Sequence, residues 1–214
     1  MNIGKVNSKI IGLLFILPLL FYGIGNSLVS TTLTLNSFDQ ASIDVKIGGL
    51  LMILNSITVT IIGILLFPIL KIHQKEIAWA YIITRVSESL LLLIGIISML
   101  SIIALSKNLS ETELNAIEFQ NLKTLIFGMN YYSYQISMLI LGLGSIPFCY
   151  LMYKQHLIPN YLSLWGCLGY GLLFAGSICE IFGFNIGLAL SIPGGLFELS
   201  FGLWLLIRGF RNSV

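Results

Sequence analysis

Residues 77–105 read IAWAYIITRVSESLLLLIGIISMLSIIAL, an apolar run that contains two charged side chains, Arg85 and Glu88. As an α-helix this segment would be about 43 Å long, which exceeds the ~30 Å hydrocarbon core of a lipid bilayer. A run of this length and polarity is typical of a transmembrane helix. It therefore indicates the fold class, and its two charges are the first candidates for a functional site.

The composition of the whole chain agrees with this interpretation. Of 214 residues, 57% are apolar and only 9% are charged, with a net charge of +2. Soluble domains are about 45–50% apolar and about 25% charged. These values exclude a soluble domain, a disordered chain, a nucleic-acid-binding protein and a disulfide-stapled secreted fold. We expect an integral membrane protein whose partner is the lipid bilayer and not nucleic acid.

Six apolar segments are long enough to cross a bilayer. To within a few residues at each end, they are about 10–30, 48–70, 77–105, 125–153, 161–184 and 186–207. Backbone groups in lipid must be satisfied within the segment, so each should be helical, and the alternation typical of a membrane β-barrel is absent. The sequence therefore predicts an all-α polytopic membrane protein, a six-transmembrane-helix bundle forming a single domain over residues 1–214.

The basic residues predict the orientation of the spans. If the N-terminus is cytoplasmic, the inner segments carry Lys5, Lys9, Lys71, Lys75, Lys154, Arg208 and Arg211, and the outer loops carry Lys46, Lys107 and Lys123. Cytoplasmic segments of membrane proteins are enriched in lysine and arginine. We therefore expect both the N-terminus and the C-terminus to be cytoplasmic.

Four charged residues fall inside the predicted spans: Arg85, Glu88, Glu180 and Glu198. A charge near the bilayer centre costs at least ~2.5–3.5 kcal/mol, so it needs a functional or structural reason. From the cytoplasmic boundary, Arg85 lies ~12 Å deep, Glu198 ~14 Å and Glu88 ~17 Å, and these similar depths predict a cross-helix contact between Arg85 and Glu198. Glu180 lies near the outer interface, where a carboxylate can be hydrated. The structural alternative for the deeper three is an ion pair that fixes helix register.

The sequence around Glu198 suggests an irregular backbone. Pro193, Gly194 and Gly195 lie in the middle of the sixth span, about one turn before Glu198. Many transporters build sites from broken helices beside intramembrane acids. We therefore predict a polar binding site at Arg85, Glu88 and Glu198 with a helix break at Pro193-Gly194-Gly195. Other polar residues within the spans are Asn55, Asn130, Tyr131, Tyr132, Tyr134 and Gln135.

Several chemistries are not indicated. The two histidines, His73 and His156, fall in predicted loops, and the three cysteines show no metal-ligand spacing. The signatures of zinc proteases, P-loop proteins and serine hydrolases are absent. We expect no metal and no cofactor, and the sequence assigns no catalytic residue.

Three segments together resemble a known family. They are LLFPILKIH at 65–73, followed by Tyr81, Arg85 and Glu88; IPNYLSLWG at 158–166; and FELSFGLWLLIRGF at 197–210. Their order and spacing resemble the bacterial membrane proteins grouped as domain of unknown function 4386. The resemblance implies a six-helix protein of the bacterial plasma membrane, and Arg85, Glu88 and Glu198 fall at its motif positions. It implies no activity.

Three functions fit these observations. The first is a small binding or transport module with a polar intramembrane site for a small-molecule or lipid ligand; six spans are few for a solitary carrier, so a homo-oligomer would be expected. The second is an accessory or sensor protein in which the charges are helix-packing ion pairs. The third is an intramembrane enzyme acting on a lipid or isoprenoid, with Glu88 or Glu198 as general base and Arg85 holding an anionic headgroup. No nucleophile or paired acidic metal motif supports the enzyme, so we favour the first two.

Overall fold

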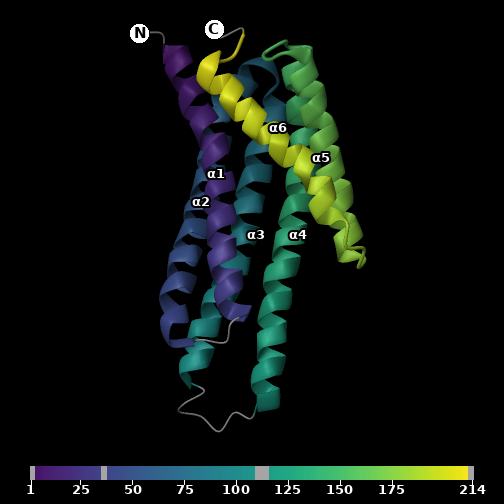
Figure 1. Ribbon diagram of the computed structural model, residues 1–214. Helices are drawn as coiled ribbons and strands as arrows, with labels where there is room; N and C mark the ends of the chain where they lie inside the picture. Colours follow the sequence, from purple (N-terminus) through teal and green to yellow (C-terminus); the bar gives the residue numbers. More distant parts are fainter. Residues whose placement is uncertain (1–2, 35–37, 109–115, 212–214) are drawn as a thin grey trace.

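The computed structural model describes residues 3–34, 38–108 and 116–211, which form six α-helices and no strand (Figure 1). The helices are α1 (Ile3–Thr34), α2 (Phe38–His73), α3 (Lys75–Asn108), α4 (Ala116–Lys154), α5 (Asn160–Ile181) and α6 (Gly187–Ile207). Each helix is apolar enough and long enough to cross a membrane. The predicted all-α, six-transmembrane-helix architecture is therefore confirmed.

The helices form a closed ring. Each packs against its neighbour in sequence, and α1 packs against α6. Gly12 of α1 and Gly202 of α6 face each other so closely that a Cβ on either one would lie 2.6–2.8 Å from the carbonyl oxygen of the other. Small residues allow this approach of helix backbones in membrane bundles. The ring therefore closes at a glycine contact, and both chain ends lie at the same end of the bundle (Figure 1).

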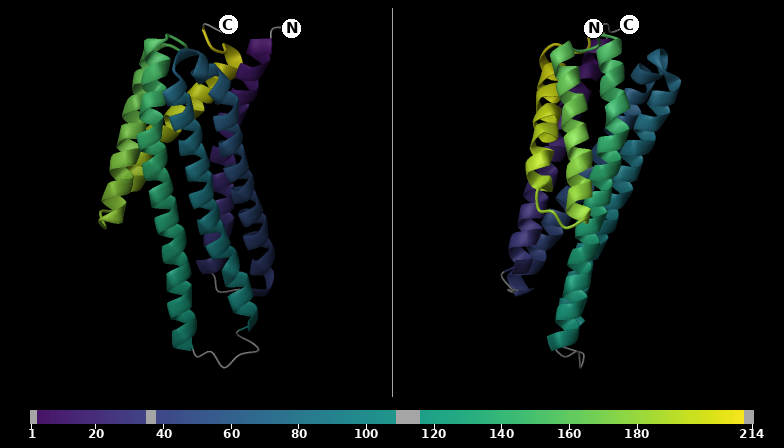
Figure 2. Two further views of the ribbon diagram at one scale, coloured as in Figure 1. Left: turned by 180° about the vertical axis from the view of Figure 1, so that it is seen from behind. Right: turned by 90° about the vertical axis from the view of Figure 1, so that its right-hand side faces the viewer.

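The helices differ in length. The first four, α1 to α4, contain 32, 36, 34 and 39 residues, whereas α5 and α6 contain 22 and 21. At about 1.5 Å per residue, the first four are roughly 48–58 Å long and the last two roughly 32 Å. The turn between α5 and α6 consequently lies far short of the distal ends of α3 and α4 (Figure 2). Beyond that turn the bundle consists of α1 to α4.

The fifth predicted span, about 161–184, extends three residues beyond α5, which ends at Ile181. Gly183 has a positive φ of 87°. Its N–H donates to the Glu180 carbonyl at 3.0 Å, and the Phe184 N–H donates to the Cys179 carbonyl at 2.8 Å. This pair of hydrogen bonds is the Schellman ending of a helix, which favours glycine because only glycine adopts positive φ without strain. Gly183 therefore ends the helix within an apolar sequence that would otherwise continue.

Two apolar clusters fill the interior, and a polar layer lies between them. The larger cluster includes Phe15, Ile62, Tyr81, Phe148, Phe197 and Phe201. The smaller one lies among α1, α2 and α3 and includes Val29, Met52 and Ile96. Along α2 and α3, the residues between the two clusters include the buried side chains of Asn55 and Glu88. This layer is where the charged residues meet.

Candidate functional site

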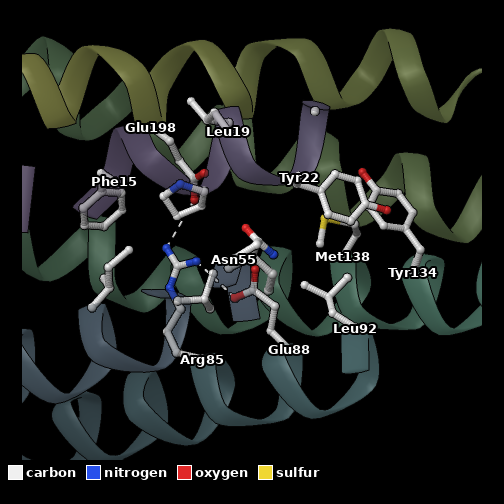
Figure 3. A pocket seen from close by; sticks show the side chains of 15 residues that line it. Phe15, Leu19, Tyr22, Asn55, Arg85, Glu88, Leu92, Tyr134, Met138 and Glu198 are labelled. Carbon is white, nitrogen blue, oxygen red and sulfur yellow. Dashed lines mark hydrogen bonds and ion pairs between the residues drawn. The ribbon is translucent and has the colours of Figure 1, made fainter. Parts of the chain in front are cut away.

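Arg85 is the centre of the polar layer. Its side chain comes from α3 and is only 2% exposed. Its Nη1 donates to Glu88 Oε2 at 3.0 Å, one turn further along the same helix, and its Nη2 donates to Glu198 Oε1 at 3.2 Å, on α6 (Figure 3). The predicted cross-helix contact between Arg85 and Glu198 is therefore present. Arg85 also forms the intrahelical pair with Glu88, although this cation-before-anion order is the weaker one in an isolated helix.

Two tyrosines complete the surroundings of Arg85. Its Nε donates to the Tyr81 hydroxyl at 2.9 Å, and its Nη2 donates to the Tyr170 hydroxyl at 3.4 Å. The Arg85 Cζ also lies 5.4 Å from the ring centroid of Phe15 and 5.3 Å from that of Tyr81, within cation–π range. Four hydrogen bonds thus engage a guanidinium that has five N–H donors. Arg85 is held in one position by helices α3, α5 and α6.

The two carboxylates keep unused acceptor capacity. Glu198 Oε1 accepts from Arg85 and, at 2.8 Å, from the Tyr170 hydroxyl. Among the residues that the structure describes, no hydrogen bond reaches Glu198 Oε2 or Glu88 Oε1. One guanidinium and two ionised carboxylates have a formal charge of −1. With both carboxylates ionised, the cluster therefore carries an uncompensated negative charge in the interior, which is costly in a low-dielectric environment unless something compensates it.

A cavity of about 200 Å³ opens beside this cluster. Arg85, Glu88 and Glu198 line one part of it, and apolar side chains form most of the remainder, including Leu19, Val59, Leu92 and Leu141. Asn55 of α2 also lines the cavity and is only 4% exposed. Within the described part of the chain, its side-chain amide has no hydrogen-bond partner, and the amide points toward the middle of the cavity (Figure 3). Buried amides are normally paired with protein groups or with water, so the Asn55 amide is free to pair with an occupant of the cavity.

A second, larger cavity of about 600 Å³ adjoins the first. It lies among α1, α4, α5 and α6, and its polar lining includes Asn26, Asn130, Tyr131, Gln135, Ser177, Glu180 and Ser191. Tyr22, Tyr134 and Met138 line both cavities. The rings of Tyr22 and Tyr134 stack, with centroids 5.3 Å apart and planes inclined by 22°. We call the cavity of about 200 Å³ the inner cavity and the cavity of about 600 Å³ the outer cavity, and this aromatic pair stands between them.

Comparison with known protein families assigns the chain to one of them. The model of a family described as a domain of unknown function, DUF4386, matches residues 10–209. The chain belongs to the DUF4386 family. No curated protein and no solved structure matches it. The family resemblance inferred from the sequence is thus confirmed, and because the family carries no assigned activity, the function of this DUF4386 chain has to be argued from its cavities.

Glu180, the fourth intramembrane charge, lies apart from the other three. Its Oε1 accepts the Gly187 N–H at 2.7 Å, and its Oε2 accepts the Tyr131 hydroxyl at 2.5 Å. Gly187 is the first residue of α6, so Glu180 satisfies a free N–H at the start of that helix. In this DUF4386 chain Glu180 therefore connects α5 to α6 and α4, and it also borders the outer cavity.

The predicted helix break at Pro193-Gly194-Gly195 is wrong. In this DUF4386 chain α6 is continuous from Gly187 to Ile207, with Pro193 inside it. Pro193 lies in the second turn, where its missing N–H removes a single helical hydrogen bond. Gly194 instead serves close packing: a Cβ on Gly169 of α5 would lie 3.0 Å from the Gly194 Cα. Glu198 therefore projects from a regular helix.

The sequence did not indicate every member of the site. It pointed to Asn55 and Tyr134 as polar residues within apolar runs, and both line the inner cavity. It gave no role to Tyr81, Tyr170 or Tyr22. Tyr81 had one usable signal, because it precedes Arg85 by four residues and so shares its helix face. Tyr132, by contrast, is 51% exposed and lines neither cavity.

Proposed function

We propose that this DUF4386 chain is a small membrane binding module of the transport type, whose ligand occupies the inner cavity beside Arg85, Glu88 and Glu198. The observation that carries this proposal is the Asn55 amide, which is buried, lines the cavity and has no partner among the described residues. If these residues served helix packing alone, we would expect the amide to be hydrogen-bonded within the protein or replaced by an apolar side chain. An unpaired amide beside two carboxylates with free oxygens is typical of a binding site that is complete only when occupied.

The proposed setting follows from the charge pattern. We place both termini in the cytoplasm of a bacterial cell and the protein in its plasma membrane, with the chain forming a single domain. This orientation puts the Arg85 cluster in the inner half of the membrane and the outer cavity toward the exterior. A homo-oligomer is part of the proposal, because six spans are few for a solitary carrier.

One observation favours a second candidate, a purely structural role for the charges. Arg85 joins α3 to α5 and α6 and uses most of its donors in doing so. That arrangement is what a helix-packing ion pair requires. It also weakens the enzyme hypothesis, which needed Arg85 to hold an anionic headgroup. A structural role explains Arg85, but it explains neither the cavity nor the unpaired Asn55.

The experiment that separates the two roles compares abundance with function. Glu88 and Glu198 are replaced singly by Gln, and each variant is tested for membrane abundance and for complementation of a deletion strain. The binding role predicts normal abundance with lost complementation, because Gln keeps the shape and a hydrogen-bonding oxygen. Glu76→Gln, the same change at an exposed residue of α3, is the matched control. Full complementation by both variants would refute the binding role, and loss of abundance would support the structural one.

A further inference from the structure

We infer that the ligand of the inner cavity is an organic cation, a primary ammonium group on a short apolar body. This inference rests on the proposed function, since it names the chemical class that the cavity binds. Four features support it: the saturation of Arg85, the free acceptors around it, the volume and walls of the cavity, and the charge of the adjoining outer cavity.

Arg85 is not available to an anion. Four hydrogen bonds to Tyr81, Glu88, Tyr170 and Glu198 use most of its N–H donors. The Arg85 Cζ also lies 5.4 Å from the ring centroid of Phe15 and 5.3 Å from that of Tyr81. An anionic ligand would have to displace a carboxylate from the guanidinium and then lie beside it. The one cation of the cluster is therefore already neutralised by the protein itself.

The free groups at the cavity are acceptors. Glu88 Oε1 and Glu198 Oε2 receive no hydrogen bond from the described residues, and the Asn55 amide adds a further oxygen. The three charged side chains leave an excess of one negative charge. An ammonium group carries one positive charge and three N–H donors, so it matches both the charge and the unfilled acceptors.

The remainder of the cavity suits an apolar body and not a metal ion. Its walls include Leu19, Val59, Leu92 and Leu141. Its volume of about 200 Å³ equals that of roughly six or seven water molecules in the liquid. A calcium ion needs six to eight oxygen ligands, and magnesium needs a near-octahedral set. The free oxygens of Glu88, Glu198 and Asn55 are fewer than either ion needs, and the hydrocarbon walls add none, whereas those walls suit a short alkyl chain.

The adjoining outer cavity is also lined by an acidic residue. Glu180 borders the outer cavity, and Tyr22 and Tyr134 separate that cavity from the inner one. Of the described residues that line the two cavities, Arg85 alone is basic. Acidic groups at successive points attract a cation and repel an anion. The stacked tyrosines also present aromatic faces, which attract ammonium groups.

The test uses hexylammonium, hexanol and hexanoate, which share one alkyl chain and differ in the charge of the head group. Each is titrated calorimetrically into the protein in lipid nanodiscs, with the heat from empty nanodiscs subtracted. We expect hexylammonium to bind at least about tenfold more tightly than hexanol, and hexanoate to show no saturable binding. Tighter binding of hexanoate would overturn the cationic class while supporting a ligand site. No saturable binding by any of the three would overturn this inference, whereas the complementation experiment tests the binding role independently.

Two variants locate the binding. Glu88→Gln removes the excess negative charge and should weaken hexylammonium binding at least about tenfold. Because that change also alters an ion pair with Arg85, Asn55→Leu is the second variant: it removes a side chain that no described residue contacts by a hydrogen bond. We expect Asn55→Leu to weaken hexylammonium binding with an unchanged melting temperature. Glu76→Gln should bind like the parent chain, and equal binding by all three variants would overturn the assignment to this cavity.

Discussion

Arg85 on α3 and Glu198 on α6 are 113 positions apart in sequence, and their side chains meet at 3.2 Å in the interior of the bundle. The contact joins a helix from the first half of the chain to the last helix. Because Arg85 pairs with both Glu88 and Glu198, one cation serves two carboxylates, and the cavity beside them is left with unused acceptor oxygens. One interaction thus contributes to both the packing of the helices and the chemistry of the site.

Arg85→Met should destabilise the protein strongly. Removing the cation leaves Glu88 and Glu198 buried together without a counter-charge, and breaking a buried pair in this way costs about 3–5 kcal/mol. We expect a lower melting temperature in detergent and lower membrane abundance. Lys75→Met, at an exposed position of the same helix, should leave both unchanged. An Arg85→Met variant with the same melting temperature as the parent chain would show that the cluster does not hold α6 in place.

Gly202→Ala should loosen the closure of the ring. The added Cβ would lie 2.8 Å from the Gly12 carbonyl oxygen, so α1 and α6 would have to move apart. We expect a lower melting temperature for Gly202→Ala. Gly195→Ala on the same helix is the control, because a Cβ there meets no atom within 4 Å. It should be neutral or slightly stabilising, since alanine favours helices. Equal melting temperatures for Gly202→Ala and Gly195→Ala would contradict the close α1–α6 contact.

Tyr134→Ala should open the passage between the two cavities. The experiment places a single cysteine at position 55 (Asn55→Cys) after Cys149, Cys167 and Cys179 have been replaced by Ala. We expect the cationic reagent 2-aminoethyl methanethiosulfonate to label this cysteine faster than the anionic 2-sulfonatoethyl reagent. Removing the Tyr134 ring should increase both rates, because that ring lines both cavities.

The labelling experiment has an internal control at the next residue. Ser56 is fully buried and lines neither cavity, so Ser56→Cys should react slowly with or without Tyr134. Rates for Asn55→Cys that are as low as those for Ser56→Cys, and unchanged by Tyr134→Ala, would mean that the aromatic pair is not the barrier on this route.

The orientation of the bundle has a direct test. A reporter active only in the cytoplasm should be active when fused after Lys71, and one active only outside should be active when fused after Ser110. The prediction follows from the positions of the basic residues. The opposite pattern would place the Arg85 cluster in the outer half of the membrane and reverse the direction of access.

The sequence predicted what depends on hydrophobicity and depth. Backbone groups need internal partners in lipid, so six apolar runs had to be helices. The contact between Arg85 and Glu198 could be predicted because opposite charges at similar depth in a membrane are stabilised by pairing. The end of α5 lies three residues before the predicted one, because the Gly183 ending lies inside an apolar stretch whose hydropathy does not change there.

Details set by packing between helices were not predictable in this way. Pro193-Gly194-Gly195 looked like a break, but Gly194 is needed for contact with Gly169, which the local sequence does not reveal. Tyr170 and Tyr22 were missed because tyrosines are frequent in this chain and each has an apolar ring. Their roles depend on which helices α5 and α1 face, a relationship that arises only when the ring closes.

The most direct measurement of the central claim, that the inner cavity is a binding site, is the behaviour of Asn55→Leu in cells. Its membrane abundance and its complementation of a deletion strain are measured together, with Glu76→Gln as the control. We predict abundance equal to the parent chain and loss of complementation, because the change replaces the Asn55 amide with an apolar group of similar shape without touching the Arg85 ion pairs. Full complementation at normal abundance would contradict the claim and leave the charges with a structural role.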